Sequence, residues 1–372
     1  MQSNASFDVC VRGTGAVGSS LALALSRQGL RVALQRAPAA PNPAADVRTY
    51  ALNARSVRLL DELKVWDGLA SDARTAVYDM RIEGDAIDAS LGFSAYAQGT
   101  DVLAWIVDAA ELDAVLANAL RFAAHVSVVD VEVAATLLVL ADGRQSAGRV
   151  ALGVETEVVH YGQRALATRL QSDCPHAGLA RQWFRSPDVL ALLPFDRPAP
   201  GRSYGLVWSL PDPRADELMA LAPAAFENAL MDATGGAAGQ LTLAGERAAW
   251  PLTLARAERV CGTGWALVGD AAHVVHPLAG QGLNLGLADV QALARVIAAR
   301  EPFRALGDDR LLRRYARERH TPTRAMGHVT DGLLQLFASE QPMVRELRNR
   351  GLTLLDALPP LKKLLAARAL QS

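Results

Sequence analysis

Residues 265–290 read WALVGDAAHVVHPLAGQGLNLGLADV, and this stretch decides the fold around it. The apolar run 266–268 predicts a buried strand that ends at a glycine followed by Asp270. A turn with Gly280 and Gly282 then opens a segment whose apolar residues recur at helical spacing. Such a segment places a carboxylate at a strand end and free backbone N–H groups at a helix start, where electron-rich groups bind. A flavin nucleotide offers a polyol chain to the carboxylate and a charge-accepting ring to the N–H groups.

A second motif lies near the start of the chain. Residues 7–11 predict a buried strand, residues 13–18 read GTGAVG and begin an apolar-faced helix, and residues 31–34 predict the next strand. In this βαβ setting GxGxxG indicates dinucleotide binding, because its glycines allow a tight turn and close approach of a pyrophosphate. A structural turn is the alternative, since 29 glycines in the chain make accidental matches possible.

Taken together, these motifs resemble the FAD-dependent aromatic hydroxylases built like p-hydroxybenzoate hydroxylase, and among them the hydroxylases of ubiquinone biosynthesis. The resemblance covers nearly the whole chain, and its most specific part is GDAAHVVHPLAGQGLNLGL at 269–287. Shorter motifs corroborate it: RTYAL at 48–52, ADG at 141–143, YGQ at 161–163, LLP at 192–194, VWS at 207–209, and the tail at 347–362.

The resemblance implies an α/β fold, in which a Rossmann-like FAD-binding domain carries an inserted mixed or antiparallel β-sheet substrate domain and C-terminal helices. The chain order agrees, because 157–209 reads as strands between turns and 214–233 reads as helix. We expect three regions: a discontinuous FAD-binding domain (1–76, 100–156 and 260–300), a β-rich substrate domain (77–99 and 157–259), and a C-terminal helical region (301–372).

The resemblance also implies a cofactor site. Asp270 should accept hydrogen bonds from the ribityl hydroxyls of FAD, with a helix cap as the alternative role. Arg48 should contact FAD rather than solvent, and Asp142 with its glycine should cover the pyrophosphate and face reduced nicotinamide rather than form an ordinary turn. The full predicted set is Gly13, Gly15, Ala16, Val17, Gly18, Gln35, Arg36, Arg48, Asp142, Gly269, Asp270, Pro277, Gly280, Gln281, Gly282, Leu283 and Asn284.

The chemistry implied by the resemblance belongs mainly to the cofactor. NAD(P)H reduces FAD as a transient reductant, and the reduced flavin activates O₂ for insertion into an electron-rich aromatic ring. The protein has to exclude water and hold the ring, so no protein nucleophile is required and no catalytic residue is assigned. His273 and His276 have no metal or triad spacing, and we interpret them as packing and hydrogen-bonding residues. Of the two, His276 is the one that we expect to contact substrate.

Three departures from the family pattern concern the AMP end of the cofactor. Gln35 stands where an acidic residue is expected to bind the ribose, and a neutral amide binds a hydroxyl more weakly. Residues 107–110 read VDAA where relatives carry an arginine or glutamine, so a phosphate-facing cation is missing or replaced by a carboxylate. The run from Val126 to Asp142 is too short for the three-stranded sheet that covers the adenosine in relatives.

Three functions therefore remain open at this point. The first is an active FAD monooxygenase acting on an aromatic small molecule or polyprenylated ubiquinone precursor. The second is a family member with weakened or lost FAD binding that acts as an accessory, scaffold or lipid-binding subunit. The third is a flavin reductase or dehydrogenase without oxygenation.

Composition excludes several other classes. A net charge of −1 gives no electrostatic case for nucleic acid binding, and three widely spaced cysteines indicate neither a metal site nor a disulfide framework. No apolar run reaches the roughly 18 residues of a spanning helix, and the first residues lack a signal-peptide layout. We therefore expect a cytoplasmic protein. The leucine- and arginine-containing stretch 345–370 predicts peripheral contact with the inner membrane face or with other biosynthetic proteins, unless it forms helices that close over the flavin domain.

Overall fold

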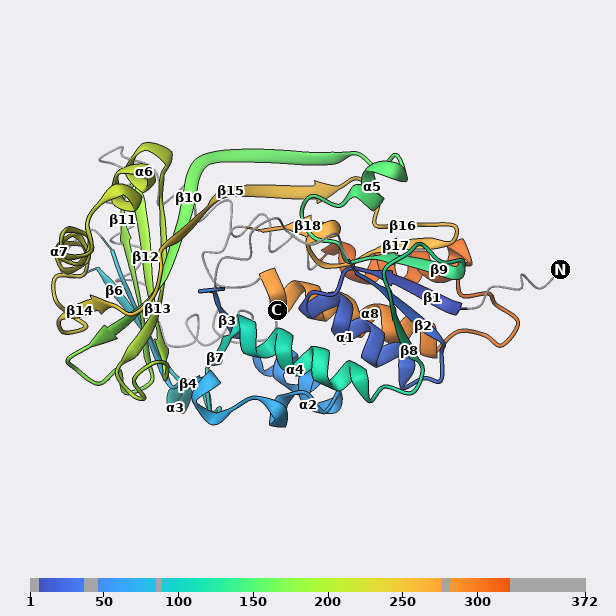
Figure 1. Ribbon diagram of the computed structural model, residues 1–372, viewed down its shortest axis with the longest axis horizontal. Helices are drawn as coiled ribbons and strands as arrows, with labels where there is room; N and C mark the ends of the chain where they lie inside the picture. The colour runs from blue at the N-terminus through green and yellow to red at the C-terminus, as the bar shows by residue number, and fades with distance from the viewer. Residues whose placement is uncertain (1–6, 37–45, 85–88, 276–281, 322–372) are drawn as a thin grey trace.

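A computed structural model describes residues 7–36, 46–84, 89–275 and 282–321 of the chain. Two large sheets lie at opposite ends of an elongated molecule, and a small third sheet lies between them (Figure 1). The predicted mixed α/β architecture is confirmed.

The first sheet has six strands in the order β16-β17-β9-β1-β2-β8. Its members are β1 (Phe7–Arg12), β2 (Val32–Gln35), β8 (Val126–Val129), β9 (Ala135–Leu140), β16 (Cys261–Gly262) and β17 (Trp265–Leu267). All neighbours except β16 and β17 are parallel. Numbered along the chain, the parallel strands lie in the order 3-2-1-4-5, so the order reverses between β1 and β9. Ligands of such sheets bind at the carboxyl ends of the strands beside this reversal.

Helices cover this sheet, whose central strands bury mainly apolar residues (Figure 1). The covering helices are α1 (Ala16–Ser26), α4 (Ala109–Arg121) and α8 (Gly282–Ala298), with α2 (Ala54–Glu62) packed on α8 and the short α5 (Ala147–Ala151) following β9. A further helix runs from 309 to at least 321. Val9, Leu21 and Val290 are fully buried where these layers meet.

The second sheet has nine strands in the order β18-β15-β10-β13-β12-β11-β5-β6, with β14 also paired to β10. Its strands are β5 (Asp79–Glu83), β6 (Ser90–Ser94), β10 (Thr156–Ser172), β11 (Leu179–Arg185), β12 (Asp188–Phe195), β13 (Ser203–Pro211), β14 (Leu241–Leu243), β15 (Ala248–Ala257) and β18 (His273–Val274). Only the β11–β5 pair is parallel, so the sheet is mixed, as expected.

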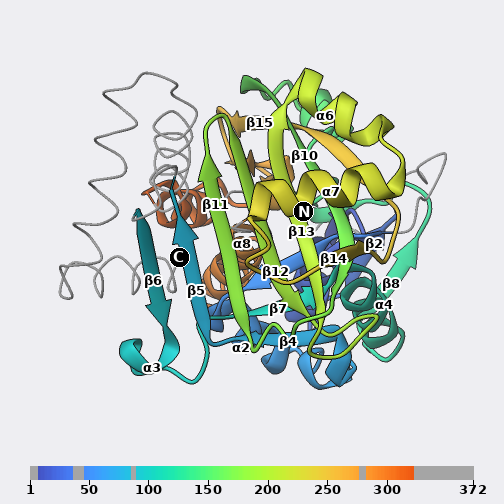
Figure 2. The ribbon, with the colours of Figure 1, turned by 90° about the vertical axis from the view of Figure 1, so that its left-hand side faces the viewer.

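The two faces of the second sheet carry side chains of different size. Helices α6 (Asp212–Ala220) and α7 (Pro223–Thr234) cover the face with Leu166, Trp208 and Leu190 (Figure 2). The opposite face carries Ala167, Val207 and Ala191, which are paired across β10, β13 and β12. Because side chains alternate along a strand, large residues pack under the helices while small ones leave space on the other side.

The third sheet joins the two ends of the molecule. It consists of β3 (Thr49–Leu52), β7 (Ala104–Asp108) and β4 (Arg74–Val77), in that order, and α3 (Ala95–Gln98) lies between β6 and β7 in the chain. Strands β10 and β15 make a second connection, because their paired halves extend from the nine-stranded sheet toward the first sheet as a ribbon (Figure 1).

The described residues test two expectations from the sequence directly. The single helix expected at 214–233 is wrong, because Leu221 and Ala222 are extended and Pro223 starts a separate helix α7. The short connection after Val126 is confirmed, since only residues 130–134 lie between β8 and β9.

Other expectations lie beyond what the structure tests. The exact domain boundaries stay a prediction, and most of the region 301–372, including 345–370, lies outside the described residues. Within the described part, no helix is long and apolar enough to cross a membrane. The same part contains no cluster of three His, Cys, Asp or Glu residues that could hold a metal ion.

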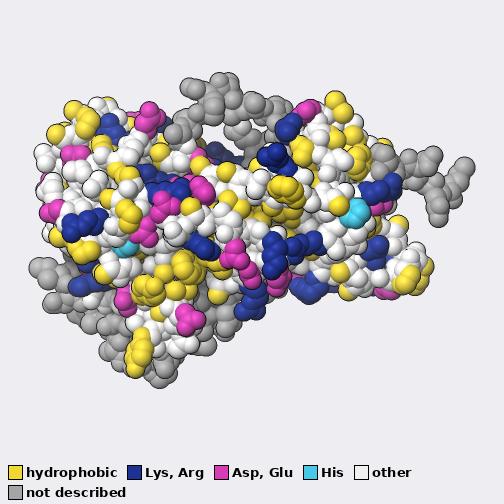
Figure 3. All heavy atoms as spheres, turned by 60° about the horizontal axis from the view of Figure 1, so that its bottom comes forward, with side chains coloured by type: hydrophobic (Ala, Val, Ile, Leu, Met, Phe, Trp, Pro, Cys, Tyr) yellow, Lys and Arg dark blue, Asp and Glu magenta, His cyan; other side chains and the backbone are white. Residues whose placement is uncertain are grey.

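Acidic and basic side chains lie beside one another on the face that Figure 3 shows.

Candidate active site

A cavity of about 600 Å³ lies between the carboxyl edge of the first sheet and the small-residue face of the second. Predicted cofactor residues line one part of it: Gly15, Ala16, Val17, Arg48, Asp270, Gly282 and Leu283. Ala165, Ala167, Ala180, Ala191 and Val207 from the second sheet line another part. Enzyme pockets for small ligands have volumes of roughly 300–1,000 Å³.

The loop after β1 has the geometry that a dinucleotide requires. A Cβ atom at Gly13, where φ is +112°, would lie 2.2 Å from the carbonyl oxygen of Ala141, and one at Gly18 would lie 2.0 Å from the carbonyl oxygen of Gly13. These two positions therefore require glycine. A Cβ at Gly15 would meet no described atom within 4 Å, so its backbone stays open to the cavity.

The start of α1 is a second part of the cradle. Gly15 is its N-cap residue, no side chain caps the helix, and its first turn has no acidic residue. The uncapped N–H groups carry the positive end of the helix dipole, which favours a phosphate.

Asp270 follows β17 in a single turn of 3₁₀ helix and lines the same cavity. Its side chain stays accessible because it faces this hollow, although protein surrounds it on the other sides. Burial raises the pKa of the Asp270 carboxyl, while His273, Arg48 and Arg144 oppose the rise. A carboxylate in such a place favours a partner that donates hydrogen bonds, as a sugar alcohol does.

The start of α8 contributes Gly282 and Leu283 to the cavity. The Asn284 side chain has a different task, since its Oδ1 accepts from the Ser56 hydroxyl at 2.7 Å and the Asn53 N–H at 3.0 Å. Its Nδ2 donates to the carbonyl oxygen of Ala51 at 2.8 Å. The side chain therefore ties α8 to α2 and β3, and a contact between Asn284 and cofactor stays a prediction for its backbone alone.

Gln35 and Arg36 lie at the AMP end of the predicted site. The Gln35 Oε1 atom is buried and has no hydrogen-bond partner among the described residues, which leaves an acceptor for a ribose hydroxyl. Arg36 is exposed and pairs with Asp130 at 3.0 Å, and it does not belong to the described cavity lining. The ion pair shows how the short link after β8 engages Arg36.

Asp142 and Gly143 follow β9 at the strand reversal. Gly143 lines the cavity, and Asp142 Oδ2 accepts the Gly148 N–H at 3.2 Å beside the start of α5. Asp142 Oδ1 is buried without a partner among the described residues. One carboxyl oxygen thus orders the turn, and contact of the other with a ligand stays a prediction.

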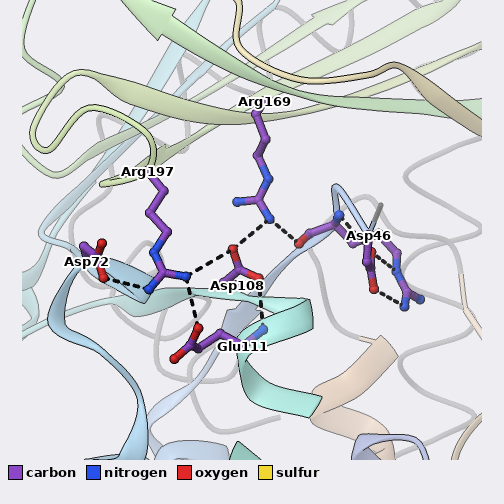
Figure 4. Close-up of polar contacts among 7 residues, drawn as sticks. Asp46, Asp72, Asp108, Glu111, Arg169 and Arg197 are labelled. Carbon is purple, nitrogen blue, oxygen red and sulfur yellow. Dashed lines mark hydrogen bonds and ion pairs between the residues drawn. The ribbon is translucent and has the colours of Figure 1, made fainter. Parts of the chain in front are cut away.

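Arg48 lines the cavity but is already paired. Its Nε and Nη2 atoms bind the two carboxylate oxygens of Asp46 at 2.8 and 2.6 Å. The carbonyl oxygen of Arg48 accepts a hydrogen bond from Arg169 Nη2 at 2.8 Å, so a strand of the second sheet holds this segment (Figure 4). Arg48 is thereby oriented, and its charge is partly neutralised before any ligand binds.

The sequence suggested that Asp108 could replace a phosphate-facing cation, and the structure corrects this. Asp108 caps α4 by accepting the Glu111 N–H at 3.1 Å and pairs with Arg169 at 3.3 Å, with Arg197 at 4.0 Å (Figure 4). Arg197 also binds Asp72 and Glu111. The Asp108 carboxylate therefore belongs to the junction between the sheets and not to the described cavity lining.

Asp113 is the cavity carboxylate that sequence reasoning missed. It lies one turn beyond the start of α4 and lines the cavity with Arg48. Its Oδ1 atom has no partner among the described residues, and burial raises its pKa to about 6, with Asp46 adding to the rise and Arg48 opposing it. The sequence did contain a signal for it, because Asp113 directly follows Leu112, which lies on the apolar side of the helix.

His273 is a hydrogen-bonding residue, as predicted, and its partner is a second missed residue. Its Nε2 atom lies 2.7 Å from Oδ2 of Asp289, which is fully buried in α8. An isolated carboxylate within the apolar sequence of α8 was the available signal.

The cavity fits FAD by these features. It joins an open glycine backbone, an uncapped helix start and a carboxylate, and unpartnered acceptors at Gln35 and Asp142 lie on the neighbouring strand ends. Gly13, Gly18 and Gly269 shape the backbone rather than line the cavity. His276, Pro277, Gly280 and Gln281 lie outside the described residues, so their predicted roles stay predictions.

Comparison with known proteins gives matches over most of the chain. A family model described as an FAD binding domain matches residues 6–329. Ubiquinone hydroxylase UbiL of Rhodospirillum rubrum is 30% identical over 98% of this chain and 89% of its own length. The 3-demethoxyubiquinol 3-hydroxylase of Escherichia coli is 30% identical over 96% of both chains.

Solved structures agree with the fold. PqsL of Pseudomonas aeruginosa, in complex with 2-aminobenzoylacetate, superposes with a TM-score of 0.77 at 22% identity, over 93% of this chain and 99% of that one. HpxO of Klebsiella pneumoniae, in complex with FAD and uric acid, gives a TM-score of 0.72 at 17% identity, over 93% and 92% of the chains.

Asp113→Asn should stabilise the apoprotein at neutral pH. The folded pKa of about 6 lies above the ordinary aspartate pKa of 3.8, so the folded state holds the proton to higher pH and loses stability as pH rises through this window. Above it, removing the charge should add roughly 1–3 kcal/mol to the free energy of unfolding, from about 1.4 kcal/mol per pKa unit. Urea unfolding at pH 7.5 and pH 4 measures this, with the exposed Asp61→Asn as control. An equal gain at both pH values would contradict the assignment.

Proposed function

Because the chain belongs to the FAD-binding-domain family, which includes the ubiquinone hydroxylases, we propose that it hydroxylates the aromatic ring of an apolar phenol, a ubiquinone-biosynthesis intermediate or a close analogue. The family, the fold class and FAD as cofactor are as the sequence predicted. The enzyme is an FAD-dependent monooxygenase that uses NAD(P)H and O₂.

One observation carries the proposal. The residues that suit the flavin and the alanine-rich face of the second sheet line the same cavity. A ring bound against that face therefore shares an enclosure with the cofactor, as transfer of an oxygen atom requires.

The cavity lining indicates which roles belong to FAD and which belong to the protein. When bound, FAD supplies the redox chemistry and the activation of O₂. The chain's own residues bind and orient: Gly15 and the start of α1 hold phosphate, and Asp270 holds hydroxyl groups. Apolar walls such as Ile106, Leu193 and Val207 exclude water from the reacting region.

The small side chains on the cavity face indicate the substrate class. Alanines leave room for a flat ring and an alkyl substituent, and Trp250 and Leu252 add apolar surface. Gln182 and Thr253 are polar groups on this part of the lining that could orient a phenol hydroxyl. Apart from Arg181, the side chains that the second sheet contributes to this lining are uncharged, which supports an apolar phenol over a highly charged substrate.

The other two functions are less well supported. A scaffold without FAD has no need for the open backbone at Gly15 or for the steric requirement for glycine at Gly13 and Gly18. A reductase without oxygenation has no need for a second, apolar part of the cavity.

We also propose a location for the protein. Stretch 345–370 lies outside the described residues, and only its alternation of leucines with arginines and lysines supports contact of a cytoplasmic protein with the inner membrane face. An apolar substrate would make such contact useful.

Purified protein should be yellow or become yellow with FAD. Saturation at 100 times the Kd should raise the free energy of unfolding by about 2.7 kcal/mol. With NADPH and 2-geranylphenol as probe, the product should contain oxygen from ¹⁸O₂, measured by mass spectrometry. A colourless protein whose Tm does not change when FAD is added would support the scaffold function. Oxidation of NADPH without incorporation of ¹⁸O into the product would support the reductase function.

Ala191→Phe should block the substrate part of the cavity while leaving the cofactor part intact. The added ring projects from the sheet face, so the KM for the probe phenol should rise at least tenfold and FAD affinity should change less than twofold. Val158→Phe, on an exposed strand outside the cavity lining, is the control. An unchanged KM in Ala191→Phe would mean that substrate binds elsewhere.

Liposome flotation tests membrane contact. The full chain should float with vesicles that contain anionic lipid, and a chain ending at residue 344 should not, because the basic residues beyond it are removed. Equal flotation of the two proteins would contradict membrane contact through residues 345–370.

A further inference from the structure

A buried carboxylate lies directly behind the predicted flavin site. Asp289, in the middle of α8, has no solvent exposure. Its Oδ2 atom accepts the Gly269 N–H at 2.8 Å and lies 2.7 Å from His273 Nε2. Its Oδ1 atom accepts from Arg319 Nε at 2.6 Å. One side chain thus joins three segments that are distant in sequence.

The network is closed and consists of buried groups. The side chains of His273 and Arg319 are only 6% and 7% exposed. Arg319 also donates from Nη2 to the Leu285 carbonyl oxygen at 3.2 Å. Burial alone would raise the pKa of Asp289, but attraction and hydrogen bonds from His273 and Arg319 outweigh it and hold that pKa below its ordinary value. The carboxylate is therefore charged at neutral pH.

Such a group is costly to bury, so its position needs a reason. Buried ion pairs add little net stability compared with apolar residues of similar size. What they provide is fixed geometry, because each partner accepts only certain directions. Here the fixed element is the turn at Gly269.

The Gly269 turn carries Asp270 into the cavity. Gly269 has φ +60°, and a Cβ there would lie 3.2 Å from the Val17 side chain, so the turn is also pressed against α1. The hydrogen bond from its N–H to Asp289 fixes the orientation of the peptide that precedes Asp270.

The turn is also packed against α8, because a Cβ at Gly286 would lie 3.4 Å from the Gly269 Cα atom. A second cavity, of about 1,030 Å³, borders the Asp289 network and is lined by Ala272, His273, Asp289 and Arg319. Close packing therefore places the turn, and the directional hydrogen bond to Asp289 sets the orientation of its peptide group.

We propose that Asp289 is a positioning residue for the flavin, which acts by holding the Gly269 turn so that Asp270 meets the ribityl chain. The inference rests on the proposed function, because it assigns a role toward FAD. His273 and Arg319 act through Asp289, and they hold its carboxylate against the turn.

Four forms of the full chain test this: Asp270→Ala, Asp289→Asn, the double variant, and Tyr315→Phe. FAD, riboflavin and ADP are the probes, and their affinities are measured by fluorescence and calorimetry well below each Tm. Asp289→Asn should weaken FAD and riboflavin binding at least tenfold and change ADP affinity less than twofold. When Asp270 is already alanine, Asp289→Asn should change FAD affinity less than twofold, because the effect of Asp289 on FAD depends on the Asp270 carboxylate.

Tyr315→Phe is the matched structural control. It removes another buried hydrogen bond, from the Tyr315 hydroxyl to the Leu267 carbonyl oxygen at 2.7 Å. This bond joins the helix at 309–321, which also carries Arg319, to strand β17, which leads into the turn. It should lower Tm and leave FAD affinity within twofold. Equal losses of FAD affinity in Tyr315→Phe and Asp289→Asn would overturn the inference, as would additive effects in the double variant.

His273→Gln keeps the proposal testable should Asp289→Asn fail to fold, since the loss of the carboxylate leaves Arg319 buried without a counter-charge. It keeps the Asp289–Arg319 pair and should weaken FAD binding about threefold or more; an affinity equal to that of the unchanged protein would count against the network. Hydrogen exchange in the apoprotein adds a readout without cofactor, because the Gly269 amide should be protected in the unchanged protein and Tyr315→Phe but exchange faster in His273→Gln. If the unchanged protein does not bind FAD, the proposed function is wrong. If the Gly269 amide exchanges equally fast in the unchanged protein and in His273→Gln, the inference that Asp289 holds the turn is wrong.

Discussion

The site depends on the reversal of strand order between β1 and β9. At that point the chain leaves neighbouring strands in opposite directions, so a crevice opens at their carboxyl ends. The loops after β1, β9 and β17 all meet there, and Gly13 approaches the Ala141 carbonyl so closely that no side chain fits. The glycine loop, the Asp142 turn and Asp270 are brought together by this one feature of topology.

The second sheet supplies the other wall through an asymmetry of side-chain size. Its outer face buries Leu166, Leu190 and Trp208 under two helices, which stabilises the sheet. On the inner face, Ala180 and Phe195 join a buried apolar cluster with the third sheet. The alanines beside this cluster leave volume that is available to a substrate.

Charge is distributed unevenly around the cavity. Arg48 is paired with Asp46, Asp113 adds an acid nearby, and the acidic ribose contact expected at the end of β2 is the neutral Gln35. Behind the flavin end, by contrast, Asp289 and its partners form a closed set of ion pairs. The end of the cavity proposed for the flavin is thus held by more buried polar contacts than the end proposed for AMP, where the connection after β8 is short.

The sequence alone determined the glycine loop, the strand–turn–helix context of Asp270 and the mixed α/β fold, because glycine spacing and apolar periodicity act on neighbouring residues. It also contained the alternation of large and small residues that divides the faces of β10 and β13. Tertiary structure alone decided that Asp108 meets Arg169, that Asp113 faces the cavity and that Asp289 binds the turn at Gly269. These contacts join residues far apart in the chain, so they depend on strand register and helix packing that no local pattern encodes.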